Sequence, residues 1–431
     1  MNLSKTFLYF NSFLIILIPP FLISGPFLPD AVCSYIGLFY LIYFIKVKDF
    51  SVYKNYFFCF FFLIYLYLNF NSLLSFNSEI SFQTSLVYFR VILFICAISY
   101  LLKNYKSLKF YFYISCLICL ILLMIDSVLD INKAISKDLS YVRVTSLFGA
   151  EQILGSYVVR ILPLIIGLSY MIKIPQRESI NLATLIIAGL LVILSGERTA
   201  FVYFFFLVIF YFFINRKQIL LFILLFSTIT FILYNYNNNS FNRIYTHTIS
   251  QQKNSGHLLS FRHEAHLLTA YNMFLEKKLF GHGLKSFRNL CDRDQYNIQL
   301  NDRKYINDVK YNFYKRNPLT PLSKDIFEVT NGCSTHPHNI YFQFLSEIGL
   351  IGFLLFFGFF LFICIKLLIF FKDFLYNKMQ CSNSYIASNF FLFGIFTAMF
   401  PMIPSGNYFN NWLLIISTLP LGFYLSLAQN K

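Results

Sequence analysis

The chain has 431 residues, of which 57% are hydrophobic and only 13% are charged. So few charged residues cannot cover the surface of a soluble globular protein, which excludes an ordinary soluble enzyme or binding domain. The net charge of +16 lies largely in connections between apolar runs, so we predict no nucleic-acid partner.

Apolar runs that approach the roughly 20 residues needed to cross a bilayer recur along the whole chain. They lie near residues 7–23, 31–47, 56–74, 86–102, 109–128, 153–172, 180–195, 200–214, 218–236, 340–371, 384–401 and 409–427. Backbone polar groups in lipid must be satisfied within their own segment, so each run is predicted to be helical. The predicted fold class is an all-α polytopic membrane protein with about 12 transmembrane helices.

Lysine and arginine are concentrated in every second short connection. The basic groups are Lys46/Lys48/Lys54, Lys103/Lys106/Lys109, Lys173/Arg177, Arg216/Lys217 and Lys366/Lys372/Lys378. The intervening loops near 24–30, 75–85 and 402–410 carry none. By the positive-inside rule the basic loops are cytoplasmic, which predicts a multi-pass protein with both termini in the cytoplasm.

The first external segment with candidate functional residues runs from Asp126 to Gln152 and includes Arg143 and Glu151. It leads into a helix that carries Arg160 about two turns from its start. A charge at this depth is costly unless it is used. Arg160 therefore either binds a phosphate group or forms a buried ion pair with Glu151.

The very short external connection from Ser195 to Ala200 holds Arg198 at the membrane surface. One interpretation is an interfacial arginine that reaches the lipid headgroups or pairs with Glu197. The other is a phosphate-binding residue, for which the guanidinium fork is well suited.

A hydrophilic stretch from Asn237 to Asn339 contains all seven histidines of the protein. It has more basic than acidic residues, and the topology makes it the large external loop. Within it, Leu268, Tyr271 and Leu275 recur at helical spacing, which predicts an amphipathic helix over residues 262–278 that lies across the membrane face. The glycines at 281 and 283 would end this helix.

The start of this helix combines Arg262, His263 and His266. The two histidines are one residue too close for the zinc-protease pattern, so we predict no metal site. Arg262 is a second candidate phosphate contact, and the histidines have an exposed helix face as their alternative interpretation.

Two of the nine cysteines, Cys291 and Cys333, lie in the large loop, whereas the others lie within or beside apolar runs. Since the topology places the loop in an oxidising compartment, these two cysteines are predicted to form a disulfide. The bond would tie the middle of the loop to the residues just before His336.

The segment from His336 to Asn339 places two histidines directly before a membrane helix. Asn339 can cap that helix, and a histidine near neutral pKa can act as a general base on a hydroxyl group. Either His336 or His338 could fill this role. Glu347 follows inside the apolar run and needs a partner, such as Arg198 or Arg262.

These features resemble the family of O-antigen ligases and O-antigen polymerases of the bacterial envelope. The similarity lies in the Ser-Gly-x-Arg element at Ser195 to Arg198, the arginine at Arg262, and the turn from Leu279 to Gly283, which has leucine where many relatives have proline. It also lies in the closing element that runs from His338 through Gly349 to Gly352. The similarity covers residues 140–352, and residues 1–139 match in hydropathy alone.

The resemblance implies an enzyme of the bacterial inner membrane that transfers a glycan at the periplasmic face. Its donor would be an undecaprenyl-diphosphate-linked oligosaccharide, with no cofactor and no metal. Arg198, Arg262 and Arg160 would hold the diphosphate and His338 would activate the acceptor hydroxyl, supported by His336, Asn339, Glu347 and Glu151.

Two functions within the family differ only in the acceptor, which is a growing glycan for a polymerase and the lipid A core for a ligase. The segment from Leu147 to Ser156 and the cysteine before His336 resemble polymerases, so polymerase is preferred and ligase is second. A chain-length regulator is a further candidate partner. The alternative from another class is a lipid-linked oligosaccharide flippase, although transporters place their sites near the membrane midplane.

This interpretation divides the chain into four regions. Residues 1–139 form transmembrane helices 1–5, and residues 140–236 form helices 6–9 with the arginine-bearing external connections. Residues 237–339 form the large, partly helical periplasmic loop, and residues 340–431 form helices 10–12.

Overall fold

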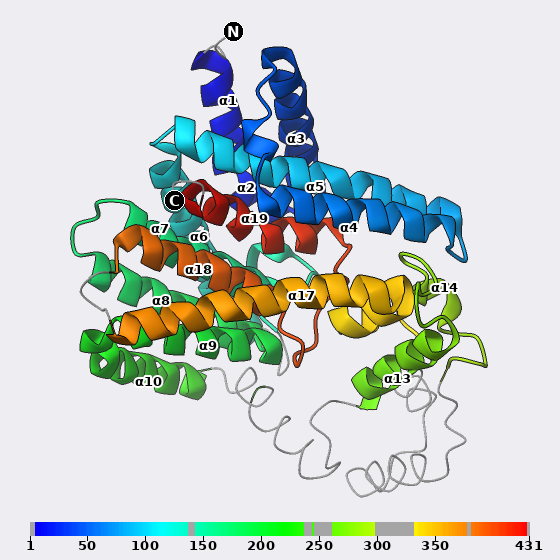
Figure 1. The fold of residues 1–431 in the computed structure, drawn as a ribbon. Coiled ribbons are helices and arrows are strands. Elements are labelled where there is room, and N and C mark those ends of the chain that lie inside the picture. The colour runs from blue at the N-terminus through cyan, green and yellow to red at the C-terminus, as the bar shows by residue number, and fades with distance from the viewer. Residues whose placement is uncertain are drawn as a thin grey trace, which may run out of the picture.

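The computed structural model describes residues 5–136, 143–236, 244, 261–297, 332–376 and 381–428. Within these ranges the chain is helical and contains no strand. The all-α polytopic fold is therefore confirmed, and Figure 1 shows most of the long helices lying side by side, with α13 and α14 beyond one end.

Every predicted apolar run corresponds to a helix. In the first half of the chain the helices are α1 (Lys5–Ile16), α2 (Ile18–Ser24), α3 (Phe27–Val47), α4 (Tyr56–Leu73), α5 (Ser78–Asn104), α6 (Leu108–Ser136), α7 (Leu154–Met171), α8 (Arg177–Ser195), α9 (Arg198–Ile214) and α10 (Ile219–Tyr236). The other helices that the structure describes are α13 (Phe261–Glu276), α14 (Phe287–Leu290), α17 (Ile340–Tyr376), α18 (Asn383–Ala398) and α19 (Asn411–Ala428), with short 3-10 turns η1 (Ser51–Tyr53), η2 (Ser146–Phe148) and η3 (Arg216–Gln218).

By length and composition, 9 helices in the described part of the chain can span a membrane, or 10 if α1 and α2 count as one span bent by 45°. The helices α9 and α18 have only 17 and 16 residues. The count of twelve therefore stays a prediction.

The two ends of the helical bundle are chemically different. The helices α7 and α18 pack antiparallel, with Pro163 beside Gly394 and Gly167 beside Phe391. The start of α7 thus lies at the same end as the 399–410 loop, which contacts the start of α17 because Ser405 N–H donates to the His338 carbonyl at 2.8 Å. The helix α8 leads away from the basic connection at Lys173 and returns to this end at Ser195. The histidines at the start of α17 and the basic connection at Lys173 therefore lie at opposite ends.

The helix α17 is interrupted at Gly349, where φ is +66°. Residues 340–348 form a short first segment, and the long apolar part follows the break. Glu347 therefore lies before the long part of the helix, at the level of the folded loop residues.

Candidate active site

The turn from Leu279 to Gly283, which the sequence predicts, docks against the break in α17 at Gly349. His282 N–H donates to Ser346 O at 3.0 Å and Gly283 N–H to Glu347 O at 2.7 Å, while Leu350 N–H donates to Lys278 O at 2.8 Å. A Cβ atom on Gly349 would lie 2.3 Å from the Leu279 carbonyl oxygen. These contacts join the large loop rigidly to the break in α17.

The folded part of the loop has its own small core, which packs around α13 and α14. It consists of Ala270, Met273, Phe287, Leu290, Cys291 and Tyr296, with Cys333 and Phe342 packed against it. A disulfide joins Cys291 and Cys333, the same pair that the sequence predicts, with their Cα atoms 4.8 Å apart. The bond connects α14 to the residues that lead into the histidine segment.

The helix α13 confirms the predicted loop helix. Its buried side chains include His266, Thr269 and Met273, whereas Leu268, Tyr271 and Leu275 are 40–45% exposed. The apolar stripe is therefore free to face lipid, and the protein contacts use the histidine side of the helix.

Four imidazole rings meet at the entrance to α17. The His338 ring lies 4.1 Å from the His336 ring, 5.1 Å from the His263 ring and 5.3 Å from the His266 ring, measured between centroids. His266 is fully buried, so the interpretation of an exposed histidine face on α13 is wrong for this residue. We call these four residues the histidine cluster. The spacing of His263 and His266, which puts both on one face of α13, is the sequence feature that could have predicted their place in it.

The backbone around His338 is held in an unusual conformation. His338 has φ of +56°, a left-handed conformation that is uncommon for residues other than glycine. The Asn339 side-chain Oδ1 accepts from Tyr341 N–H at 2.9 Å and its Nδ2 donates to Pro401 O at 2.7 Å. Asn339 therefore caps α17, as expected from its position, and ties the residue after His338 to the 399–410 loop.

Burial affects the acid–base properties of His336. It lowers the pKa of this imidazole to about 4, an effect to which nearby His266, Arg288 and His263 add, although hydrogen bonding to Ser405 opposes it. Thr335 Oγ1 lies 3.0 Å from His336 Nδ1. His336 is therefore neutral at pH 7. No group of three or more His, Cys, Asp or Glu side chains among the described residues is arranged to hold a metal ion.

Glu347 is buried and has polar partners other than an arginine. Gln343 Nε2 donates to Glu347 Oε2 at 3.0 Å, and the Phe287 N–H donates to Oε1 at 3.4 Å. Gln343 also binds Asn407 and the Tyr408 N–H. The predicted pairing of Glu347 with Arg198 or Arg262 stays a prediction, because the Arg262 side chain lies outside the described part of the structure. Through Gln343, the Glu347 carboxylate connects the backbone of the large loop at Phe287 to the 399–410 loop.

The arginine-bearing connections form a second group at the same end of the bundle. The Glu197 carboxylate accepts from Gly155 N–H at 2.8 Å and Ser156 N–H at 3.1 Å, so it caps α7. Burial raises the pKa of Glu197, and the hydrogen bond from Gly155 and the charge of Arg143 oppose this. Arg143 Nε in turn donates to Ser195 O at 3.1 Å. From the sequence, Glu197 was expected only as a partner of Arg198, and no role was expected for Arg143.

The structure describes two of the three candidate phosphate-binding arginines in full. Arg160 is 7% exposed, and its Nη1 donates to the Ser156 carbonyl at 2.9 Å. It forms no ion pair with Glu151, which is exposed, so that interpretation of Arg160 is wrong. Arg198 is partly exposed at the first position of α9. Arg262 lies in the first turn of α13, and its side chain is outside the described part of the structure.

The residues from 183 to 357 match the family model described as O-antigen ligase. This segment resembles an O-antigen ligase domain. It includes Arg198, Arg262, the Leu279–Gly283 turn and the histidine cluster, and it excludes Arg160. The match covers less than half of the chain, and it supports the resemblance to O-antigen ligase and polymerase membrane enzymes that was drawn from the short motifs. Comparison with curated proteins and with solved structures gives no match.

Proposed function

We propose that this protein transfers a glycan from an undecaprenyl-diphosphate carrier to a hydroxyl group at the periplasmic face of the bacterial inner membrane. The observation that carries this proposal is the convergence of His263, His266 and His336 on His338. They meet at the start of a membrane helix, within the segment that resembles an O-antigen ligase domain. A donor anchored in lipid and a polar acceptor can meet at this level.

In the proposed reaction, His338 accepts the proton of the acceptor hydroxyl as its oxygen attacks the anomeric carbon. The bond between that carbon and the diphosphate oxygen breaks, and undecaprenyl diphosphate leaves. His336 is the weaker candidate for the base, because a pKa of about 4 is far from the working pH, whereas an efficient base has a pKa near it.

Arginines would stabilise the diphosphate as negative charge develops on it, since fixed cations aimed at a leaving group lower the barrier. Arg198 and Arg262 are the main candidates, and both lie in the segment that resembles an O-antigen ligase domain. Arg160 is the weaker candidate because its guanidinium is buried and bound to its own helix. Arg198→Lys is expected to lose activity, because a lysine cannot reproduce the two-point contact of a guanidinium.

Polymerase is our preferred activity, and ligase is second. A strain that lacks this gene distinguishes them through its lipopolysaccharide banding pattern and its pool of lipid-linked glycan. Core carrying a single repeat unit would identify a polymerase, and bare core with long polymer on the carrier would identify a ligase. Accumulation of single lipid-linked units on the cytoplasmic side would instead support the flippase.

A further inference from the structure

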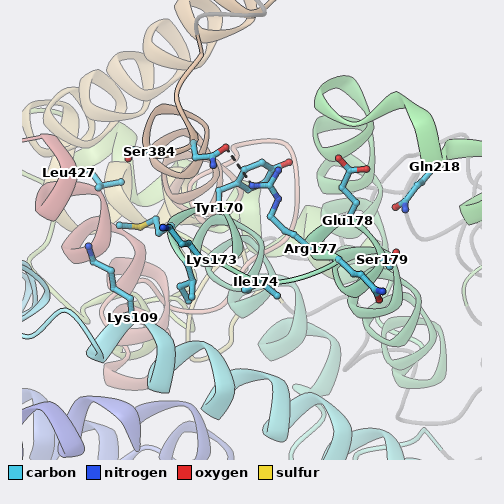
Figure 2. A pocket seen from close by; sticks show the side chains of 14 residues that line it. Lys109, Tyr170, Lys173, Ile174, Arg177, Glu178, Ser179, Gln218, Ser384 and Leu427 are labelled. Carbon is cyan, nitrogen blue, oxygen red and sulfur yellow. Dashed lines mark hydrogen bonds between the residues drawn. The ribbon is translucent and has the colours of Figure 1, made fainter.

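A cavity of about 840 Å³ lies at the end of the bundle opposite the histidine cluster. Its walls come from the start of α6, the connection between α7 and α8, the start of α18 and the end of α19 (Figure 2). The proposed transfer reaction does not use it, because both the histidines and the arginine-bearing connections lie at the other end.

The polar wall of this cavity has an excess of positive charge. Lys109, Lys173 and Arg177 line it with a single carboxylate, that of Glu178. Figure 2 shows Glu178 on the far side of Arg177 from both lysines, and none of these four residues forms an ion pair in the described structure. The two lysines therefore keep their charge available for an anion.

Arg177 is fixed in place within the cavity wall. Its guanidinium lies 4.2 Å from the centre of the Tyr170 ring, and its Nη1 donates to Asn383 Oδ1 at 3.5 Å. Its Nε is buried with no hydrogen-bond partner. A positioned guanidinium with a remaining donor suits a phosphate group.

The helix α8, 19 residues long, begins in the same wall. Its N-cap residue, Gln176, makes no side-chain capping hydrogen bond. The first N–H groups of a helix lack partners within the helix and carry partial positive charge, so they favour an anion. The helix start thus adds to the charge of the three basic side chains.

The remaining walls are apolar and include Met171, Ile174 and Leu427. They lie where α7 and α19 end, which is the depth at which lipid headgroups meet hydrocarbon. We propose that this cavity binds the headgroup phosphate of an anionic phospholipid from the adjacent leaflet, with its acyl chains along the apolar wall. Basic pockets between membrane helices recognise such lipids by charge, whereas a free phosphate ion would gain nothing from the apolar wall.

The test compares lipid retention by the full-length protein and by a variant with Lys109→Gln and Lys173→Gln. Each protein is purified in detergent, mixed with equal amounts of phosphatidylglycerol and phosphatidylcholine, and examined by native mass spectrometry. Wild type should retain phosphatidylglycerol in preference to phosphatidylcholine. With each lysine worth about fivefold in affinity, the double variant should bind phosphatidylglycerol roughly 30-fold more weakly.

The control carries Lys217→Gln and Lys372→Gln, which remove the same charge from exposed positions at the same end that do not line the cavity. Equal retention by the cavity variant and this control would overturn the proposal, as would equal binding of the two lipids. Inorganic phosphate is added in a separate arm. If it bound at millimolar concentration through Lys109 and Lys173 while phosphatidylglycerol did not bind, the ligand would be a soluble anion and the lipid proposal would be wrong.

Discussion

Replacement of Gly349 by alanine should separate the docked loop from α17. Alanine in the left-handed conformation at φ of +66° costs about 1–2 kcal/mol. The added Cβ atom would also lie 2.3 Å from the Leu279 carbonyl oxygen, so the backbone must shift. That shift would break the hydrogen bonds from Leu350 to Lys278 and from Ile351 to Leu279, each worth about 1 kcal/mol.

Together these effects should reduce the stability of this junction by about 3–4 kcal/mol. Gly358→Ala is the matched control, because Gly358 lies in the same helix and a Cβ there would meet no atom within 4 Å. In a helix interior this control should stabilise the protein by up to about 1 kcal/mol. For Gly349→Ala, the thermal unfolding temperature in detergent and the glycan output should both be lower than for wild type. For Gly358→Ala, neither should fall. Equal behaviour of the two variants would refute the role assigned to the docked turns.

The remaining predictions concern residues that hold the site together. The pKa of His336 in the folded protein, about 4, lies below the usual value near 6.5. Between these two pH values the unfolded chain therefore binds more protons than the folded protein does. The stability of the fold should consequently decrease as the pH drops from about 6.5 to 4. The unfolding temperature of wild type should therefore fall over this pH range, and in His336→Gln it should fall less steeply. An equally steep fall in the variant would contradict the assignment of this pH dependence to His336. Loss of the Cys291–Cys333 bond, which closes a 42-residue separation, should remove about 4 kcal/mol on the chain-entropy model. Limited proteolysis should then cut the loop faster in Cys291→Ser/Cys333→Ser than in Cys59→Ser, an exposed free cysteine; equal rates would refute this. Glu197→Gln should destabilise the protein by about 2 kcal/mol, because one charged acceptor of the α7 N–H groups is lost; an unchanged melting temperature would exclude this capping role.

The helices were predictable because membrane spans depend on a simple local property, the hydropathy of about 20 consecutive residues. Capping of α17 by Asn339 was predictable for a similar reason, since the capping side chain and the backbone N–H groups that donate to it are neighbours in sequence. The disulfide followed from the presence of only two cysteines in the large loop.

The partners of buried polar groups were not predictable, because they come from distant parts of the chain. Glu347 binds Gln343 and the loop backbone at Phe287. Glu197 caps α7 from 41 and 42 residues away. The burial of His266 and Thr269 on α13 was also missed, since the apolar stripe at Leu268 and Tyr271 gave the stronger helical pattern.

The most direct test of the account measures glycan transfer by the purified protein in liposomes, with a lipid-linked donor and an acceptor glycan. His338→Ala is compared with wild type and with His336→Ala, and the unfolding midpoint of each variant confirms that it is folded. Removing a general base slows a reaction by about 10²- to 10⁴-fold, and we expect such a loss for His338→Ala and a smaller one for His336→Ala. Transfer by folded His338→Ala at the wild-type rate would contradict the assignment of His338 as the base.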